Sequence, residues 1–553
     1  MRILLAAVNA KFIHTALGVR ALRAYVGEDA VDIAEFTINE RVQDAVREIY
    51  ERRADMVMFS CYIWNIEFIL KTAGSLRKIA PDTAIVFGGP EVSFDSVYYM
   101  EKYPFIDAVI RGEGEETLRD IIGSGLAVRG VTHRDGGRIV EEPDRPPVCD
   151  INDLPFPYTD RELDEYRDKL LYYESSRGCP FRCSYCLSST VHSVRFRDIE
   201  TVKRELAVFA EHGARVVKLT DRTFNADRRR AAGLIEYLSS LRCRTQFHFE
   251  IAAELIDDET AELFRRAPRD RFLLEIGVQS TNPETLSAID RPADIQRIAA
   301  AAERLRGHVH MHLDLIAGLP YEDHGSFVNS FNEVMAMRPD VLQLGFLKLL
   351  RGTKLREEAG KHGYKFTDEP PYEVLANNYM SYDELTELKR VEVILDRYYN
   401  SSGFEHSLGY LSGRYDTPYA MFLDIAMYFE ARGYFGTGMS QRSLYAALAD
   451  MYDDPLFKDL LKLDFFININ NPSTPQWAAE PFDRTLLKRR FAMIESALEE
   501  GRLPGYEGVP LKEIIKTVQA ERFSYNVLGG GEKIENIILF DKKYGRVTAV
   551  SDK

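Results

Sequence analysis

The segment Ser176-Arg177-Gly178-Cys179-Pro180-Phe181-Arg182-Cys183-Ser184-Tyr185-Cys186 holds three cysteines within eight residues. The whole chain has only six cysteines, so half of them fall in this one stretch. Thiolates gathered this closely are typical of a metal site. Three thiolates rather than four leave an iron–sulfur cluster with one iron that has no protein ligand, and such an iron can bind and activate a small molecule.

The spacing of the cysteines favours a cubane cluster. One short loop with the pattern C-x₃-C-x₂-C can wrap a cubane so that each thiolate takes one iron. Gly178 and Pro180 permit the tight path of this loop, and Arg177 and Arg182 are placed to offset the thiolate charge.

A structural zinc site is the alternative, with a fourth ligand from His192, Cys149 or Cys243. Zinc sites usually pair their ligands as two C-x₂-C knuckles. The sequence has no second knuckle, so the iron–sulfur cluster is the favoured interpretation.

Length and composition indicate a globular protein with several domains. A chain of 553 residues is too long for a single core, so two to four domains are expected. The net charge of −15 argues against a protein that coats nucleic acid, which needs a basic surface. No stretch approaches the roughly 18 apolar residues of a membrane span. The other cysteines show no disulfide framework, so a reducing, cytoplasmic location is expected.

Residues 1–125 alternate strand-like and helix-like patterns, which predicts a doubly wound, Rossmann-like parallel sheet of the α/β class. The expected strands are Ile3–Val8, Val31–Ile38, Met56–Cys61, Thr83–Gly89 and Asp107–Gly112. Ligands on such sheets lie at the carboxyl ends of the strands. The Gly-x-Gly-x-x-Gly fingerprint is absent after the first strand, which argues against a nicotinamide cofactor.

Residues 126–165 contain five prolines between 143 and 157, so we expect a connector without regular structure. Residues 166–360 alternate again, and repeated strand–helix units with right-handed crossovers predict a partial (β/α)₆ barrel. Its expected strands are Lys169–Ser175, Arg215–Asp221, Thr245–Ala252, Arg271–Ser280, His308–Ala317 and Asp340–Leu349. The cysteine segment follows the first of these strands directly, on the face where barrel active sites lie.

Residues 361–553 are expected to form a third, mostly helical domain that ends in a hairpin. Helical patterns cover Tyr382–Tyr399 and Thr485–Glu500, and Glu535–Val550 reads as a hairpin turned near Gly545. Composition alone assigns no chemistry to this region.

The segment from Cys179 to Cys186 resembles the signature of the radical S-adenosylmethionine (SAM) superfamily, including the aromatic residue before the last cysteine. The first domain resembles the cobalamin-binding domain of the B12-dependent subfamily. The C-terminal region is similar to a domain of unknown function that follows this pair in some bacterial proteins. The resemblance implies three cofactors, which are a [4Fe-4S] cluster held by Cys179, Cys183 and Cys186, SAM, and cobalamin.

Positions that match the family motifs imply contacts to SAM. Tyr185 matches an adenine contact, and Glu250 is placed to bind the ribose hydroxyls. The remaining matches are Gln279, Ser280, Ile316 and Gly318. Glu250 as an ordinary ion-pair carboxylate and Gln279 as a helix cap remain alternatives. The usual Gly-Gly-Glu segment is missing, so Asp221 or Arg222 is expected to grip the amino acid end of SAM instead.

The sequence pattern for cobalamin binding is weaker than that for SAM. The Asp-x-His-x-x-Gly motif, whose histidine ligates cobalt, is absent, and His14 is the nearest but poorly spaced substitute. The resemblance and the glycines at the strand ends point to Ser60, Cys61, Gly88, Gly89, Pro90 and Glu113. Glu113 also has an ordinary interpretation as an acidic residue at a helix N-terminus.

The resemblance implies an enzyme. The leading hypothesis is a cobalamin-dependent radical SAM methyltransferase, which cleaves SAM reductively to a 5′-deoxyadenosyl radical and passes a methyl group from methylcobalamin to a substrate carbon. The alternative is a radical SAM cyclase, rearrangement or oxidation enzyme that uses cobalamin as an electron carrier or not at all. A third hypothesis is a non-catalytic cobalamin- or iron-responsive binding protein.

The expected partners are a reductant such as flavodoxin or ferredoxin and a small-molecule or peptide substrate. The sequence leaves the identity of the substrate and the oligomeric state open.

Overall fold

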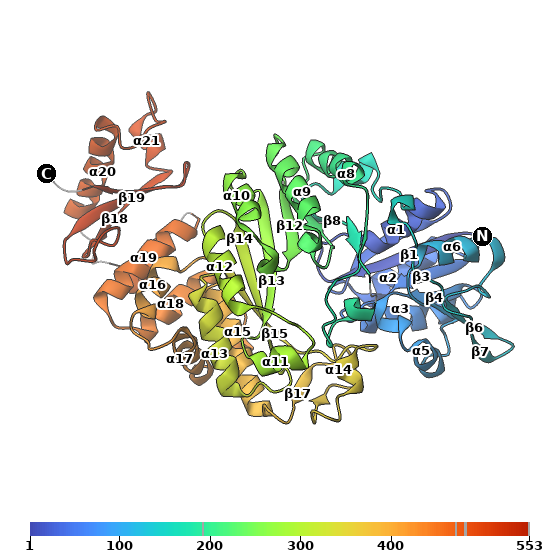
Figure 1. Cartoon of the computed structure of the whole chain (residues 1–553). Coiled ribbons are helices and arrows are strands. Elements are labelled where there is room, and N and C mark those ends of the chain that lie inside the picture. The colour runs from blue at the N-terminus through green and yellow to red at the C-terminus, as the bar shows by residue number, and fades with distance from the viewer. Residues whose placement is uncertain (191–192, 471–472, 480–483, 551–553) are drawn as a thin grey trace. The chain divides into compact units, whose positions relative to one another are not determined.

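The computed structural model (Figure 1) describes residues 1–190, 193–470, 473–479 and 484–550, with only the backbone for 484–489. The chain divides into two compact units, Met1–Leu385 and Thr386–Lys553. The first unit holds two large sheets with their helices and two small two-stranded sheets. Its last part, residues 361–385, lies beyond the end predicted for the barrel.

The first sheet has seven strands in the order β2-β1-β3-β4-β5-β6-β7. Its five parallel strands confirm the predicted ones, and they are β1 Ile3–Asn9, β2 Asp32–Thr37, β3 Met56–Ser60, β4 Ala84–Gly88 and β5 Ala108–Ile110. Both faces bury apolar side chains, as expected for a sheet that helices cover on both sides. One face packs α1 Leu17–Val26 and α6 Glu115–Ser124, and the other packs α2 Val42–Glu51 and α3 Ile66–Ile79.

The expectation of an irregular connector is wrong over part of its length. β6 Val131–Asp135 and β7 Arg138–Glu141 form an antiparallel hairpin that extends the first sheet beyond β5. The hairpin forms because the prolines begin only at Pro143, while Gly136 and Gly137 both take the positive φ of a two-residue turn. After the prolines begin, a short helix, α7 Asp160–Glu165, starts with a capping box.

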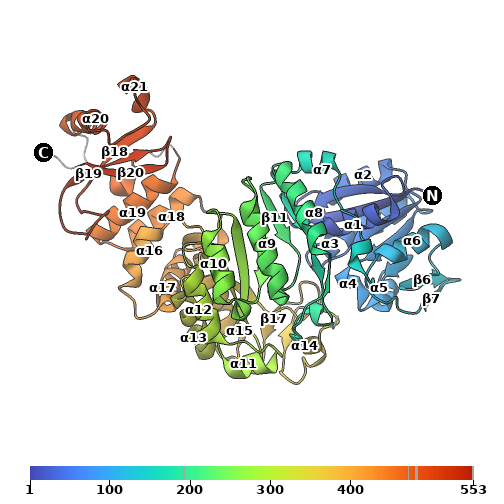
Figure 2. The same cartoon turned by 45° about the horizontal axis from the view of Figure 1, so that its top comes forward.

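The second sheet has six parallel strands in sequential order, which confirms the predicted partial barrel. Its strands are β8 Leu170–Tyr173, β11 Val216–Leu219, β12 Gln246–Ile251, β13 Phe272–Gln279, β14 His310–Ala317 and β15 Val341–Phe346. Buried and half-buried residues alternate along β12, β13 and β14. The buried set is apolar and packs under helices such as α9 Arg228–Ser240 and α10 Asp258–Arg266 (Figure 2). The half-buried set is largely polar and faces the barrel interior.

The second unit is mostly helical, as predicted. Its helices include α15 Tyr382–Tyr398, which begins in the first unit, α16 Glu405–Ser412, α17 Pro418–Ala431, α18 Gln441–Met451, α19 Pro455–Asn468 and α20 Arg484–Glu499. The predicted terminal hairpin is β19 Asn536–Asp541 with β20 Arg546–Val550. A third antiparallel strand that the sequence analysis missed, β18 Val518–Phe523, completes this sheet.

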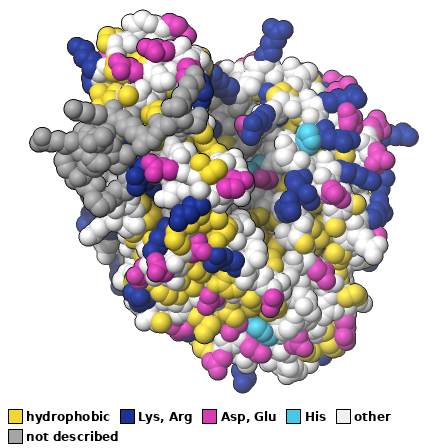
Figure 3. All heavy atoms as spheres, turned by 90° about the vertical axis from the view of Figure 1, so that its left-hand side faces the viewer, with side chains coloured by type: hydrophobic (Ala, Val, Ile, Leu, Met, Phe, Trp, Pro, Cys, Tyr) yellow, Lys and Arg dark blue, Asp and Glu magenta, His cyan; other side chains and the backbone are white. Residues whose placement is uncertain are grey.

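The described residues contain no helix that is both long and apolar enough to cross a membrane. On the face shown in Figure 3, acidic and basic side chains are interspersed.

Candidate active site

The cysteine loop leaves the barrel at the carboxyl end of β8. A short strand, β9 Ser176–Arg177, pairs with β10 Arg195–Phe196 and sets the start of the loop. Gly178 follows with φ +107°, and a Cβ there would lie 2.2 Å from the carbonyl oxygen of Ser193, so only glycine fits. Within the loop Cys183 is buried, whereas Cys179 and Cys186 are half-buried.

Hydrogen bonds from two distant segments hold the middle of the cysteine loop. The Ser184 amide donates to the Ile289 carbonyl at 2.9 Å, and the Leu355 amide donates to the Ser184 carbonyl at 2.9 Å. The guanidinium of Arg291 lies 3.8 Å from the Cys183 sulfur, and the Thr223 hydroxyl lies 3.5 Å from the Cys179 sulfur. Groups that donate N–H or O–H to sulfur stabilise thiolate and help set the reduction potential of an iron–sulfur cluster.

The donors of the loop are three cysteines, of which two have a hydrogen-bond donor near the sulfur, and such a set fits a cluster with three thiolate ligands. A structural zinc holds four ligands at about 2.0–2.3 Å, which requires them to converge on one point. In the part of the chain that the structure describes, no three His, Cys, Asp or Glu side chains lie close enough to hold one metal ion. His192, one of the predicted zinc ligands, lies outside the described residues.

Asp221 supports the loop instead of facing a ligand. Its carboxylate accepts hydrogen bonds from the Ser175 amide at 2.8 Å, the Ser176 amide at 3.0 Å and the Ser175 hydroxyl at 2.5 Å. Burial raises the pKa of Asp221, although these hydrogen bonds oppose the shift. Both carboxylate oxygens of Asp221 are therefore engaged. Arg222 is exposed, so it remains the better candidate of the two residues predicted to bind the amino acid end of SAM.

Glu250 and Gln279 lie at neighbouring strand ends of the barrel. Glu250 is the last residue but one of β12, and its carboxylate lies 3.6 Å from the Lys218 ammonium. Burial raises the pKa of Glu250, and the charges of Lys218 and Arg222 oppose the shift. Gln279 has φ +71°, where the register between β13 and β14 shifts, and its side-chain amide lies against Gly277. Such backbone strain in a non-glycine residue is common at functional sites.

Of the other predicted SAM contacts, two are partly exposed and two already form hydrogen bonds within the protein. Tyr185 and Ile316 are half-buried. Gly318 has φ +89°, and its carbonyl already accepts from the Tyr364 hydroxyl at 3.0 Å and the Asn377 amide at 2.9 Å. Ser280 is fully buried and donates to Glu322 at 2.5 Å, so its hydroxyl supports the fold around the site.

Glu322 makes the stability of the barrel depend on pH. Burial raises its pKa to about 7, and hydrogen bonds from Ser280 and Ser330 only partly oppose the shift. The folded state therefore binds this proton more tightly than the unfolded state. The protonated Glu322 carboxyl stabilises the fold fully below pH 4.5, and this stabilisation is lost as the pH rises through 7. The loss lowers the free energy of unfolding by about 3 kcal/mol.

We therefore expect the urea midpoint of the wild type to fall between pH 5 and pH 8. In Glu322→Gln, which mimics the protonated acid, the midpoint should stay level and exceed the wild-type value at pH 8. Glu333→Gln, an exposed position of the helix that follows Glu322, α13 His324–Ala336, is the matched control and should follow the wild type. If the urea midpoint changed equally with pH in the wild type and in Glu322→Gln, Glu322 would not be the source of the pH dependence.

The predicted cobalamin residues lie at the carboxyl ends of β3 and β4. Ser60 and Gly88 end these strands, and the Cys61 amide donates to the Gly88 carbonyl at 2.7 Å. Gly89 has φ +109°, and a Cβ there would lie 2.5 Å from the Cys61 carbonyl oxygen. Cys61 is fully buried, and its carbonyl accepts from the Glu91 amide at 3.3 Å, so the prediction that it contacts a ligand is wrong. Pro90 starts the next short helix.

Exposed apolar side chains surround the same edge of the first sheet, and the sequence analysis missed them. They follow the ends of β1 to β4, and they are Phe12, Ile13, Ile38, Trp64 and Phe94. Trp64 is 49% exposed and stacks on Tyr62, with ring centroids 4.4 Å apart. Aromatic residues directly after a strand end were the available signal, because large apolar side chains at a ligand edge are seldom needed for the core.

His14 has a local partner. Its imidazole Nδ1 lies 2.7 Å from the Tyr172 hydroxyl, and the Leu170 amide at the start of β8 donates to the Ile13 carbonyl at 2.8 Å. The loop after β1 therefore joins the barrel directly. The carboxyl edge of the first sheet lies against the barrel through this contact.

Arg177 connects the two predicted cofactor loops. Its guanidinium lies 3.1 Å from Glu113, 2.8 Å from Glu115 and 2.7 Å from Glu174. Glu113 also pairs with Arg195 at 2.5 Å and accepts from the Val148 amide. Burial raises the pKa of Glu113, but Arg195 and Arg177 outweigh it and hold the value below the ordinary one. Both oxygens of Glu113 are thus engaged with protein, so the structure places it between the loops as an anchor.

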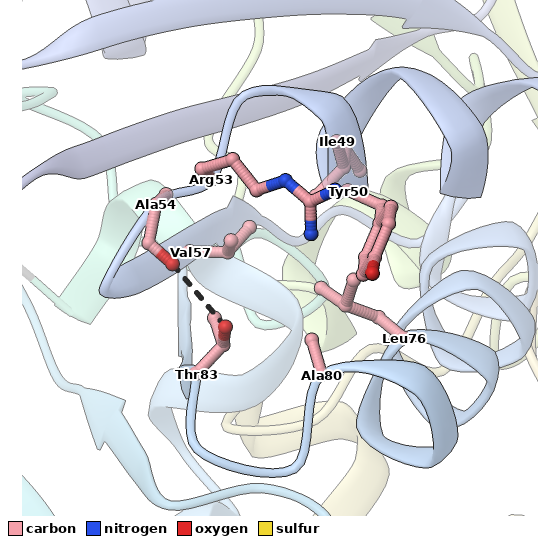
Figure 4. Close-up of a pocket in the computed structure, with 8 residues that line it drawn as sticks. All are labelled: Ile49, Tyr50, Arg53, Ala54, Val57, Leu76, Ala80 and Thr83. Carbon is pink, nitrogen blue, oxygen red and sulfur yellow. Dashed lines mark hydrogen bonds between the residues drawn. The ribbon is translucent and has the colours of Figure 1, made fainter.

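One cavity lies away from this site. It opens at the amino ends of β3 and β4, between α2 and α3, and has a volume of about 180 Å³ (Figure 4). Arg53 and Tyr50 extend over it, and the Thr83 hydroxyl bonds the Ala54 carbonyl at 3.2 Å. Because ligands of doubly wound sheets bind at the opposite edge, this cavity has no part in the predicted chemistry.

Three protein families match successive parts of the chain. The B12 binding domain matches residues 3–122, the radical SAM superfamily matches residues 173–334, and a protein of unknown function, DUF4080, matches residues 360–540.

Curated relatives and a solved structure agree with these matches. The cobalamin-dependent radical SAM methyltransferase TokK of Streptomyces tokunonensis is 28% identical over 57% of this chain and 50% of its own length. The 2-(S-pantetheinyl)-carbapenam-3-carboxylate methyltransferase of Streptantibioticus cattleyicolor is 26% identical over 78% of this chain and 70% of its own. The radical SAM methyltransferase TsrM from Kitasatospora setae, solved with cobalamin and a [4Fe-4S] cluster, shares the fold with a TM-score of 0.55 at 17% identity, over 67% of this chain and 78% of that chain.

The first sheet and the barrel with its cysteine loop correspond to a B12-binding domain followed by a radical SAM domain. The chain carries a B12-binding domain, a radical SAM domain and a C-terminal DUF4080 domain, and this combination confirms the predicted resemblance to cobalamin-dependent radical SAM enzymes. The [4Fe-4S] cluster, SAM and cobalamin are the cofactors of these matched domains, which confirms the predicted set. The chain spans only half the length of TokK, so its own reaction is a separate question.

Proposed function

We propose that this protein is a cobalamin-dependent radical SAM methyltransferase that adds a methyl group to a carbon of a small polar molecule. The observation that carries the proposal is the contact between the cysteine loop and the loop after β5, made by Arg177 with Glu113 and Glu115. When bound, the cluster and SAM supply a radical that activates a substrate C–H bond, and cobalamin supplies the methyl group. Transfer between two cofactors requires that their sites be close and sheltered from water.

The residues at the strand ends have distinct roles in this proposal. Cys179, Cys183 and Cys186 hold the cluster and leave one iron open for SAM. Glu250 and Tyr185 bind the nucleoside part of SAM, and Arg222 binds its carboxylate. On the other side, the backbone at Ser60, Gly88, Gly89 and Pro90 would hold cobalamin, and Trp64 would lie at the rim of that site.

The inner face of the barrel indicates a polar substrate. The Lys218 ammonium lies 2.7 Å from Glu275, and His248 lies 3.0 Å from the same carboxylate. Burial tends to raise the pKa of Glu275, but His248 and Lys218 bring it to about 2, so Glu275 is ionised. Asp314 has one buried oxygen without a hydrogen-bond partner among the described residues, and burial raises its pKa. Unpaired buried polar groups favour a ligand that can hydrogen-bond and disfavour a lipid.

Anaerobic purification tests the cofactors, and product analysis tests the reaction. We expect about four irons and one cobalt per chain. With SAM and a chemical reductant, the protein should form S-adenosylhomocysteine from methylation of its cobalamin, together with 5′-deoxyadenosine. A cyclase or oxidation enzyme would form 5′-deoxyadenosine without S-adenosylhomocysteine. A protein with zinc in place of iron would contradict the proposal. In cells we expect a cytoplasmic reductant such as flavodoxin or ferredoxin to supply the electron.

A further inference from the structure

The loop after β15 contacts the loops of both predicted cofactor sites. It leads into the short helix α14 Lys354–Glu357. The Leu355 amide in this helix donates to the Ser184 carbonyl of the cysteine loop at 2.9 Å. On the other side, a Cβ at Gly352 would lie 2.3 Å from the ring of Phe94, so the loop packs closely against the segment after β4. One segment of the barrel therefore supports the edge of the first sheet and the cysteine loop together.

Arg351 is the residue of this loop that holds the segment after β4. Its side chain is only 10% exposed, and its guanidinium forms an ion pair with Asp95. Its Nε donates a hydrogen bond to the Tyr372 hydroxyl at 2.9 Å. The guanidinium also lies 4.3 Å from the centre of the Tyr98 ring. Because the N–H groups of arginine form a rigid fork, Arg351 fixes Asp95 and Tyr372 relative to each other.

Tyr372 connects Arg351 to Glu91. Tyr372 is fully buried, and its hydroxyl donates to Oε1 of Glu91 at 2.5 Å. The Tyr99 hydroxyl donates to the same oxygen at 2.6 Å. Glu91 is itself buried, which raises the pKa of its carboxyl group, although the two hydroxyl donors oppose this shift. A buried carboxyl group depends on such donors, because burial without hydrogen bonds is unfavourable. The donors therefore hold the Glu91 side chain in one position.

Glu91 and Asp95 lie directly after the backbone that is predicted to hold cobalamin. Glu91 comes two residues after Gly89, and its amide donates to the Cys61 carbonyl at 3.3 Å. Asp95 follows at the start of the next helix, α5 Ser96–Lys102. A ligand-binding backbone keeps its geometry only when the residues that support it are themselves held in place. The path of the chain at Gly89 therefore depends on the contacts that hold Glu91 and Asp95.

We propose that Arg351 is a positioning residue for cobalamin. Through Tyr372 and Asp95 it holds the segment after β4, and this segment keeps the backbone at Gly89 in the arrangement that accepts the cofactor. Without Arg351, the backbone adopts this arrangement for only part of the time, and the affinity for cobalamin falls by the same fraction. The inference rests on the cobalamin binding of the proposed function, and it does not depend on which reaction the enzyme catalyses.

Calorimetric titration of hydroxocobalamin into the full chain, produced without cobalamin, tests the proposal. We expect Arg351→Gln to weaken binding about tenfold, as when a buried group loses its hydrogen-bond partner. Tyr372→Phe keeps the ring and removes only the hydroxyl, so it should weaken binding about threefold. Arg351→Lys keeps the charge beside Asp95 without the fork of donors, so its affinity should lie between those of the wild type and Arg351→Gln. All three variants should keep about four irons per chain.

Lys361→Gln is the matched control, because this cation lies ten residues after Arg351, is 61% exposed and pairs with Glu358. It should bind hydroxocobalamin like the wild type. Equal affinities of the wild type and Arg351→Gln would overturn the proposal, and so would an equal loss in Lys361→Gln. If Arg351→Gln fails to fold by circular dichroism, the comparison of Tyr372→Phe with the wild type decides in the same way. A wild type that binds no hydroxocobalamin would contradict the proposed function as well, whereas the other outcomes leave it standing.

Discussion

Cys183→Ala should lose the iron–sulfur cluster and all formation of 5′-deoxyadenosine while it keeps cobalamin. Cys183 is the buried member of the triad and receives the Arg291 guanidinium at 3.8 Å, so its removal takes away one of three ligands and leaves that cation without its sulfur. The cobalamin residues at the ends of β3 and β4 lie outside the loop and should be unaffected. Iron, sulfide and cobalt analysis of protein purified without oxygen, followed by product chromatography, measures both effects.

Cys149→Ala is the control for this substitution, because Cys149 is exposed and lies outside the triad. It should keep about four irons per chain and the activity of the wild type. A non-catalytic cobalamin-binding protein would show no difference between the two variants in any turnover. Full cluster content in Cys183→Ala would refute the assignment of the loop.

The sequence predicted the strands of both parallel sheets because their signals are local. Buried parallel strands are short apolar runs, such as Met56–Ser60 in the first sheet, and the alternation in Phe272–Gln279 separates a helix-facing from an inward-facing set. The spacing of the three cysteines is a local signal of the same kind. Helix and strand periods are read within one segment, without knowledge of what lies across the fold.

The errors concern contacts between distant segments. The hairpin of β6 and β7 was missed because proline density was averaged over the whole connector, although the prolines begin only after the hairpin. Ser280 and Asp221 looked like ligand contacts from their position at strand ends. Their side chains bond to Glu322 and to the Ser175 segment instead, and a partner 42 or 46 residues away leaves no local trace.

Glu113 is a further residue whose partners are too distant in sequence to be predicted from the local pattern. Its acidic loop suggested a cobalamin contact or a helix N-terminus, whereas the structure pairs it with Arg177 and Arg195. Neither arginine is near Glu113 in sequence. Through these ion pairs, the loop after β5 in the first domain contacts the start of the cysteine loop. The sequence of either segment alone does not reveal this contact.

Arg177→Gln should therefore weaken both the fold and the hold on cobalamin. The substitution leaves three carboxylates, Glu113, Glu115 and Glu174, without the cation between them, and only Arg195 continues to neutralise Glu113. Breaking a buried ion pair from one side costs about 3–5 kcal/mol. We expect a lower urea midpoint and less cobalt per chain after gel filtration.

Two further substitutions distinguish the ion pairs of Arg177 between the two loops from simple loss of side-chain packing. Arg41→Gln removes a guanidinium that is 80% exposed and pairs with Asp44, so it should change stability by less than about 1 kcal/mol. Adding Glu115→Gln to Arg177→Gln removes one of the unpaired charges and should restore part of the stability and of the cobalt content. If the double variant is no better than Arg177→Gln alone, the charge between the two loops is not what holds them, and packing of the long side chain is the cause.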